Sequence, residues 1–196
     1  MPSAGDRHTG YAQHPPFECE RVEEWYSWGR GEPGLKMPPG VSFGSLNQEP
    51  RLFLLVVHYA ATDETGNTTT TPSAIVLQET PVPQGPLKQA SAFLTLGAPK
   101  IMTRNSVLEA ETSCQITQQI AFHTLLFLPH THGMGKLVQM WKTDGQSGEK
   151  TLIAEADPQQ VQMYRPVNGT VVITNGDAVT LKCIYQTPTG HDVDIG

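Results

Sequence analysis

Charge is scarce in this sequence of 196 residues: 16% of the residues are charged, with 13 Lys and Arg against 19 Asp and Glu. The formal net charge is −6 and the chain has no basic cluster, so we expect no nucleic-acid partner, because such partners are bound through Lys and Arg. No apolar run approaches the roughly 20 residues that cross a bilayer, so we expect no membrane segment in this chain. Residues 1–16 lack the basic and apolar regions of a secretion signal and are interpreted as a disordered start.

Cysteine is also rare, with Cys19, Cys114 and Cys183 as its three positions. None of them belongs to a close pair such as CxxC, so a structural zinc site is not indicated, and the odd count leaves at least one thiol unpaired within the chain. Two glycosylation sequons begin at Asn67 and Asn168 and favour the secretory pathway or the extracellular space. Secreted features without a signal predict a chain cut from a longer protein.

Short apolar runs separated by turn residues dominate from about residue 50 onward, and no segment has a convincing helical period. Several runs, such as AVTLKCIY, alternate apolar and polar residues as a half-buried strand does. The predicted strands are Arg51–Tyr59, Ser73–Gln78, Ala92–Leu96, Val107–Thr112, Ile120–Leu128, Lys136–Trp141, Thr151–Glu155, Thr170–Thr174 and Ala178–Tyr185. This succession predicts an all-β fold of antiparallel β-sandwich or jelly-roll units.

A proline-dense stretch at residues 79–89, ETPVPQGPLKQ, interrupts the rhythm of strands. We interpret it as the junction between two tandem units that are joined near residues 81–86. The first unit, residues 17–83, is too small to bury a good core alone and is therefore expected to be incomplete. The second unit is expected to cover residues 84–196.

Two histidines, His130 and His132, follow an apolar run in the stretch FLPHTHGMGKLVQ. If this stretch is a strand, both side chains lie on one face, with their Cα atoms roughly 6.5 Å apart. Two imidazoles at that distance can converge on one ion, and imidazole is a ligand for copper, zinc, iron and nickel. His123 lies an odd number of residues before His130, so we expect it on the opposite face, as a core histidine that supports the site.

Two other classes of metalloenzyme are compatible with two histidines one residue apart. A cupin places a glutamate three or four residues after the second histidine, whereas GMGKLVQ follows His132 and contains no carboxylate. A zinc-dependent hydrolase needs a third ligand and a general base, and neither is evident here. Both interpretations are weaker than a copper site.

Around HTHGMGKLV the chain resembles the copper type II, ascorbate-dependent monooxygenases, and most closely their peptidylglycine α-hydroxylating branch. The resemblance extends over WYSWGRGEPGLKMPPGVSFG, LFLLVVHYA, TPVPQGPL, AETSCQIT and GDAVTLKCIY, in the order and approximate spacing of that family. It covers nearly all of residues 17–196. It implies a complete enzyme that hydroxylates a substrate carbon with dioxygen, two coppers and ascorbate as the reductant.

Carried over residue by residue, the resemblance gives His130 and His132 the copper site at which the substrate is hydroxylated. His58 matches one histidine of the second, electron-transfer copper site. His123 is expected in a supporting role. The methionine ligand of the first site and an adjacent His-His pair of the second would lie outside this chain.

The resemblance also implies that Cys19, Cys114 and Cys183 form disulfides with cysteines outside the chain. This pattern predicts an internal fragment that is inactive by itself.

The substrate is left open by Leu128, which stands where the peptide-amidating branch carries an arginine that binds a terminal carboxylate. Leucine cannot form that charge-assisted pair. A peptide substrate remains the leading interpretation, and a dopamine β-monooxygenase-like enzyme acting on another small molecule is an alternative. A further alternative is an inactive β-sandwich that serves as an interaction module.

Overall fold

The structure is a computed structural model, and it describes residues 26–27, 32–43, 76, 86–93, 95, 101–102, 104–188, 190 and 193–194. The chain divides into two compact units that differ from the predicted ones in their residues. In the structure, the first unit contains residues 1–35 and 92–196, and the second unit contains residues 36–91. The described part of the chain contains strands and no helix, so the expected all-β fold is confirmed. It accordingly offers no helix that is long and apolar enough to cross a membrane.

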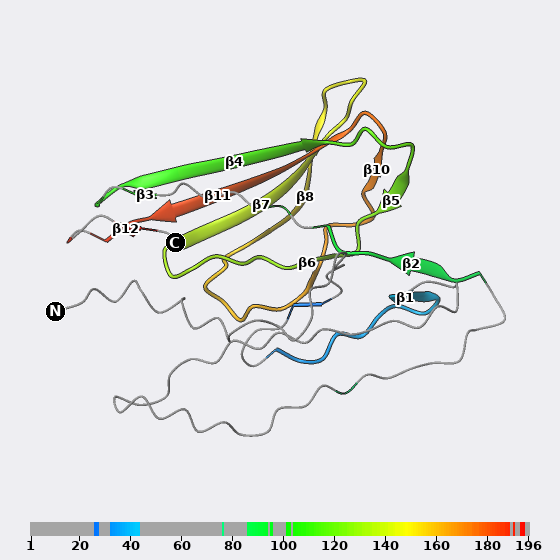
Figure 1. The fold of residues 1–196 in the computed structure, drawn as a ribbon, viewed down its shortest axis with the longest axis horizontal. Coiled ribbons are helices and arrows are strands. Elements are labelled where there is room, and N and C mark those ends of the chain that lie inside the picture. The colour runs from blue at the N-terminus through cyan, green and yellow to red at the C-terminus, as the bar shows by residue number, and fades with distance from the viewer. Residues whose placement is uncertain are drawn as a thin grey trace, which may run out of the picture. The chain divides into compact units, whose positions relative to one another are not determined.

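A four-stranded antiparallel sheet is the largest element of the first unit (Figure 1). Its strand order is β4-β11-β7-β8, so the last long strand of the chain lies between two earlier ones. The four strands are β4 (Val107–Gln115), β7 (Gly135–Thr143), β8 (Lys150–Ala156) and β11 (Ala178–Gln186).

One face of this sheet is apolar because its strands alternate side chains between two faces. On β11 the residues Val179, Leu181, Cys183 and Tyr185 are buried, while the residues between them are half-buried. Strand β7 adds Val138, opposite Cys183, to the same face. The alternation in AVTLKCIY therefore belongs to a strand with one buried face, as the sequence predicted.

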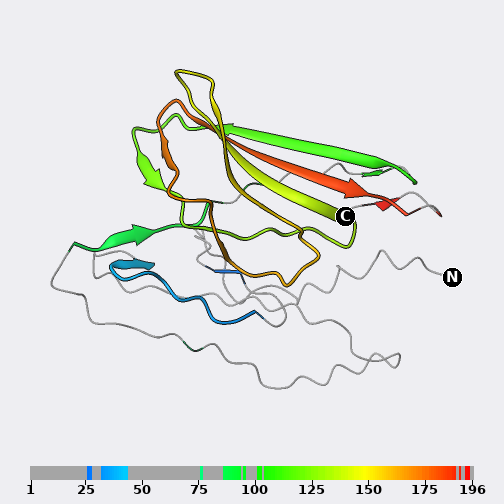
Figure 2. The ribbon, with the colours of Figure 1, turned by 180° about the vertical axis from the view of Figure 1, so that it is seen from behind.

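Short two-stranded ladders complete the first unit, and Figure 2 shows β5 and β10 beyond the end of the sheet at which β4 ends. Phe127 on β6 and Ile173 on β10 are buried together with residues of the large sheet in one hydrophobic core. The antiparallel ladders pair β5 (Ala121–His123) with β10 (Val172–Thr174), β6 (Leu126–Phe127) with β9 (Arg165–Pro166), and β3 (Ile101–Met102) with β12 (Val193–Asp194).

The second unit contains one described ladder, in which β1 (Val41–Phe43) pairs in parallel with β2 (Lys88–Ala90). Strand β2 lies just before the predicted strand Ala92–Leu96, whose described residues 92, 93 and 95 are not in a strand. That prediction is wrong because the backbone pairing with β1 involves the residues before it. The predicted strand Arg51–Tyr59 lies outside the described residues, as does Ser73–Gln78 apart from Val76.

The predicted single strand Ile120–Leu128 is divided in the structure into β5 and β6. The interruption occurs where the chain changes partner: the Thr124 backbone N–H donates to Val171 O (3.0 Å), and Leu125 O accepts from the Val167 N–H (3.4 Å). The apolar content of the segment was visible in the sequence, but the exchange of β10 for β9 as partner was not. The predicted strands that correspond to β4, β7, β8, β10 and β11 are confirmed.

Candidate copper site

His130 and His132 lie in the connection between β6 and β7, outside any strand, in agreement with the predicted strand limits at Leu128 and Lys136. The two histidines are exposed and Thr131 between them is buried, so both imidazoles are still on the same side of the chain. Pro129, the residue directly before His130, is among the most deeply buried side chains and attaches this point of the chain to the interior. The connection thus brings the two rings side by side, as was expected if this stretch were a strand.

The two imidazole rings lie close enough to share one metal ion. Their centroids are 5.7 Å apart and their planes are nearly perpendicular, at 88°. When two imidazole nitrogens lie about 2 Å from one ion, the ring centroids are separated by at most about 6 Å. The observed separation is inside that limit, so the donor set and its spacing fit a metal that accepts imidazole ligands.

Gln162 determines which nitrogen of His130 is available to a metal. The Gln162 Oε1 and His130 Nδ1 atoms are 3.0 Å apart. An amide oxygen only accepts hydrogen bonds, so Nδ1 carries the hydrogen and Nε2 retains the lone pair that binds a metal. Sequence reasoning missed Gln162, because a contact between residues 32 positions apart leaves no local spacing signal.

A tight turn follows the two histidines and brings residue 135 back onto Thr131. The Gly135 N–H donates to His132 O (3.1 Å). A Cβ on Gly135 would collide with the Thr131 hydroxyl, Cβ and methyl group, so only glycine fits at this position. The glycine after HTHGM is therefore explained by a close approach within the turn.

Gln159 holds the same turn from outside, through its side-chain amide nitrogen. This Nε2 atom lies 3.0 Å from His132 O, 3.1 Å from Gly135 O and 3.3 Å from Thr131 Oγ1. Both glutamines belong to the segment of residues 157–162 that follows β8. The turn that carries the histidines is thus attached to this segment at the imidazole ring and at the backbone.

Of the other two candidate histidines only His123 is among the described residues, and no described contact joins it to this turn. His123 is exposed at the end of β5, where it pairs with Val172, so the expectation of a core histidine is wrong. The strand ends at His123, and the face argument that assumed one regular strand therefore does not apply. His58 lies outside the described residues, as do Cys19 and Asn67.

The two described cysteines are free thiols in different surroundings. Cys114 is exposed near the end of β4, whereas Cys183 is buried in the core. Burial raises the pKa of the Cys183 thiol, and this effect is partly offset by its hydrogen bond with Tyr185. Low reactivity is therefore expected for Cys183 at neutral pH, because the thiolate is the reactive form.

Leu128 and Asn168 are both described, and their surroundings differ. Leu128 is half-buried between the buried residues Phe127 and Pro129. Asn168, Gly169 and Thr170 of the second sequon are all exposed. The Asn168 backbone N–H donates to Ile153 O (2.9 Å), which fixes the chain at the sequon while its side chain faces solvent.

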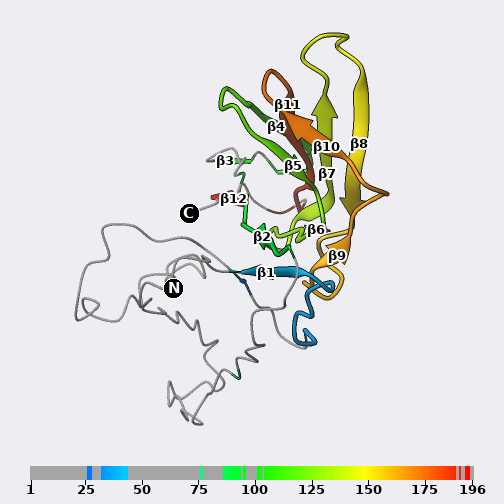
Figure 3. The same cartoon turned by 90° about the vertical axis from the view of Figure 1, so that its right-hand side faces the viewer.

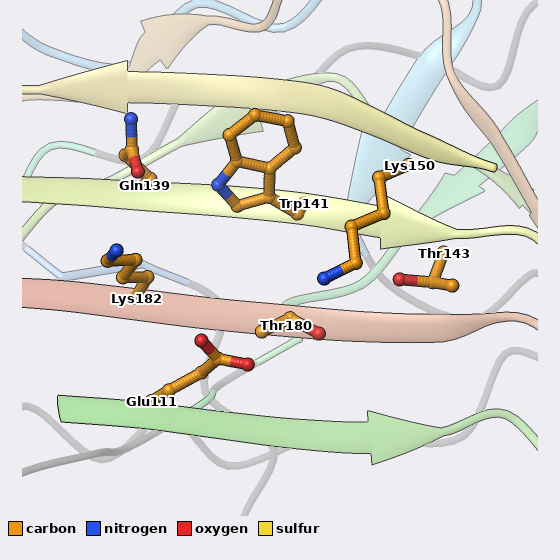
Figure 4. A pocket seen from close by; sticks show the side chains of 7 residues that line it. All are labelled: Glu111, Gln139, Trp141, Thr143, Lys150, Thr180 and Lys182. Atoms are coloured by element: carbon orange, nitrogen blue, oxygen red, sulfur yellow. The ribbon is translucent and has the colours of Figure 1, made fainter. Parts of the chain in front are cut away.

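A hollow of about 220 Å³ lies on the sheet face opposite the core, as Figure 4 shows. Its charged groups have both signs, and Lys182 is paired with Glu109 beside it (2.8 Å). The hollow contains no histidine, so it is separate from the candidate copper site. Its lining residues are Glu111, Gln139, Trp141, Thr143, Lys150, Thr180 and Lys182.

Within the described ranges, no third His, Cys, Asp or Glu joins a pair of such residues to form a group that could hold a metal ion. The candidate site in this part of the chain therefore consists of two imidazoles and the residues that orient them. Figure 3 shows the first unit from the side, with β6, the strand before the histidines, beside its ladder partner β9.

Comparison with known proteins points to one family. Residues 89–196 match the family described as "Copper type II ascorbate-dependent monooxygenase, C-terminal domain". The matched range includes β3 to β12 and both histidines of the candidate site.

Individual relatives agree with this match. The chain is 30% identical over 162 residues to a peptidylglycine alpha-amidating monooxygenase of Rattus norvegicus. It is 28% identical over 161 residues to the enzyme of Mus musculus and 26% identical over 162 residues to form B of Xenopus laevis. Each alignment covers 82% of this chain but only 16% to 18% of the relative.

Proposed function

The chain belongs to the copper type II, ascorbate-dependent monooxygenase family, and on that premise we propose that His130 and His132 bind the copper ion at which a substrate carbon is hydroxylated. The observation that carries this proposal is the pair of exposed imidazoles whose centroids are 5.7 Å apart. Imidazole is a good ligand for copper, and the hydrogen bond to Gln162 leaves Nε2 of His130 available for it.

Copper, when bound here, supplies the one-electron redox chemistry by which dioxygen is activated, with ascorbate as the reductant. The residues of this chain have other tasks. His130 and His132, both exposed, hold the ion at the surface, where a substrate can approach it. Gln162 keeps the hydrogen on Nδ1 of His130 and prevents the ring from rotating.

A peptide that ends in glycine is the proposed substrate, because the relatives are named for acting on peptidylglycine. Leu128 offers no positive charge for a terminal carboxylate, so a different group must bind it if the substrate is a peptide. Another small molecule, as in a dopamine β-monooxygenase-like reaction, is the alternative. Binding of a glycine-extended peptide to the Cu(II)-loaded chain, compared with binding of the same peptide without its terminal glycine, distinguishes the two.

The remaining assignments of the resemblance are part of the same proposal. His58 belongs to a second copper site that transfers an electron. The supporting role of His123 rests on the resemblance alone, since no described contact joins it to the histidine turn. Asn67 and Asn168 carry glycans, which places the protein in the secretory pathway or outside the cell.

The copper assignment is tested by titrating the purified chain with Cu(II). We expect His130→Ala combined with His132→Ala to remove the tightest binding event. The matched control is the double variant His8→Ala and His14→Ala, which removes the same number of imidazoles and should bind as the unmodified chain does. Undiminished binding in the His130 and His132 variant would remove the assignment and favour a β-sandwich interaction module.

A further inference from the structure

We propose that Gln159 is a positioning residue for the copper pair, because its side-chain amide fixes the turn that begins at His132 and the residue, Thr131, that joins His132 to His130. The inference deepens the proposed function and rests on it. The hydrogen bonds of the Gln159 amide reach His132 O, Gly135 O and Thr131 Oγ1, so its effect is exerted through the turn.

The contacts of the Gln159 amide are concentrated on the turn of residues 132–135 and on Thr131 directly before it. Nε2 has two hydrogens that three acceptors share, and its two shortest contacts are with His132 O (3.0 Å) and Gly135 O (3.1 Å). These two carbonyl groups are also the ends of the turn. A single amide group therefore joins its first and last peptide units.

A third contact reaches the residue between the two histidines. Thr131 Oγ1 lies 3.3 Å from Nε2, and the Thr131 side chain is buried against Gly135. The direction of each imidazole depends on the backbone on both sides of Thr131. Holding Thr131 and His132 together therefore fixes the direction from which both rings approach an ion.

Gln159 is itself held in place by the tight turn after β8. Its backbone N–H donates to Asp157 Oδ1 (2.8 Å), as in an Asx turn. Pro158, between the two, is buried. The amide is therefore attached directly after the end of β8, and it restrains the histidine turn relative to that strand.

A merely structural glutamine would alter stability and leave the metal unaffected. A positioning glutamine alters the metal site, because a copper ion bound by two rings on a loose turn samples several arrangements. Loss of residues that orient metal ligands typically weakens metal binding by about 10-fold to 100-fold. The two roles are thus separated by measuring copper affinity and thermal stability on the same variants.

The test compares Gln159→Met with Gln160→Met in the full 196-residue chain. Methionine matches glutamine in length but donates no hydrogen bond. Gln160 is the adjacent residue of the same type, is exposed, and keeps its backbone bond to Asp157 O in the variant. Cu(II) affinity is measured by competition with a chelator, and the Cu(II) environment by electron paramagnetic resonance.

We expect Gln159→Met to bind Cu(II) about 10-fold more weakly and to give a heterogeneous resonance spectrum. Its metal-free thermal midpoint should stay within about 4 °C of the unmodified chain, and Gln160→Met should change none of the three readouts. Gln159→Asn, whose amide is one methylene too short, should lie between them. This second variant keeps the test decisive if Gln159→Met folds poorly.

Unchanged affinity and spectrum in both Gln159 variants would overturn the inference. If the His130→Ala and His132→Ala variant loses copper at the same time, only the positioning role fails. If that variant also binds copper normally, the copper assignment itself fails.

Discussion

At the scale of single residues, the identity of Gly135 depends on one close approach. Gly135→Ala would place a Cβ on the buried Thr131 side chain, so the turn must open or the first residues of β7 must move. We expect a loss of about 2 kcal/mol in the free energy of unfolding, together with weaker Cu(II) binding. Urea denaturation and copper titration measure the two effects.

Gly133→Ala is the matched control within the same turn, since a Cβ at Gly133 meets nothing within 4 Å. This variant should change stability by less than about 1 kcal/mol, in keeping with a surface substitution. Equal effects of the two alanines would contradict the explanation by steric contact.

A second single-residue prediction concerns Asn168. The residues of its sequon are exposed, so an oligosaccharide can be attached to the folded chain. Expression through a eukaryotic secretory pathway should give a product that loses one glycan on Asn168→Gln and equally on Thr170→Ala. Mass measurement before and after enzymatic deglycosylation gives the mass of attached glycan in each chain. An equal loss of mass in all three chains would refute glycosylation at this position.

At the scale of elements, Asp177 joins two turns at one end of the large sheet. Its carboxylate accepts from the Thr174 N–H (2.7 Å) and the Gly145 N–H (3.0 Å), and it pairs with Lys142 Nζ at 3.0 Å. Gly145 approaches the Gly176 carbonyl so closely that a Cβ could not be accommodated. The hairpin between β7 and β8 is thereby attached to the turn before β11.

The Asp177 network predicts how stability depends on pH. Burial raises the pKa of Asp177, but the Thr174 and Gly145 N–H groups and Lys142 outweigh that effect and lower the pKa to about 2. Because the pKa is lower in the folded chain than in the unfolded one, the carboxylate stabilises the fold at neutral pH. This contribution should be lost as the pH falls from about 4 to about 2.

Asp177→Asn should lower the free energy of unfolding at pH 7 by about 3 kcal/mol, since it leaves Lys142 without its buried partner. It should also remove part of the decrease in stability between pH 4 and pH 2. Urea denaturation across this range measures both effects. Glu111→Gln, at an exposed position, serves as the control, and a variant as acid-sensitive as the unmodified chain would contradict the role of Asp177.

At the scale of the whole molecule, the sheet register prevents Cys114 and Cys183 from bonding to each other. On neighbouring strands, Cys114 is opposite Val179 and Cys183 is opposite Ala110. Positions 179 and 183 are four residues apart along β11, or about 13 Å, whereas a disulfide requires Cα atoms within about 7 Å. We predict that Cys19, Cys114 and Cys183 are not bonded to one another.

Mass spectrometry of the oxidised, proteolysed monomer tests this prediction. All three cysteines should be recovered in peptides that are not linked to one another, and any intrachain disulfide would contradict it. The described residues already agree, since Cys114 and Cys183 are both free. Pairing of these cysteines with partners outside the chain stays a prediction.

The sequence by itself determined the β class, the positions of the long strands and the pair of histidines. These features depend on local patterns: the alternation along β11 buries Val179 and Leu181, and one residue between His130 and His132 places both rings on one side. The family was also recognisable from motifs in order. Domain limits at residues 17–83 and 84–196 were predicted from proline density and remain a prediction.

Only the tertiary structure decided how the candidate site is held. The division of residues 120–128 into β5 and β6, the exposure of His123, and the contacts of Gln159 and Gln162 all depend on segments that are distant in sequence. Hydrogen bonds between such segments require a close approach that the whole fold creates, and no spacing within the chain encodes them. Local pattern therefore indicated the two histidines that we propose as copper ligands, whereas long-range packing determined which residues contact them and the turn beside them.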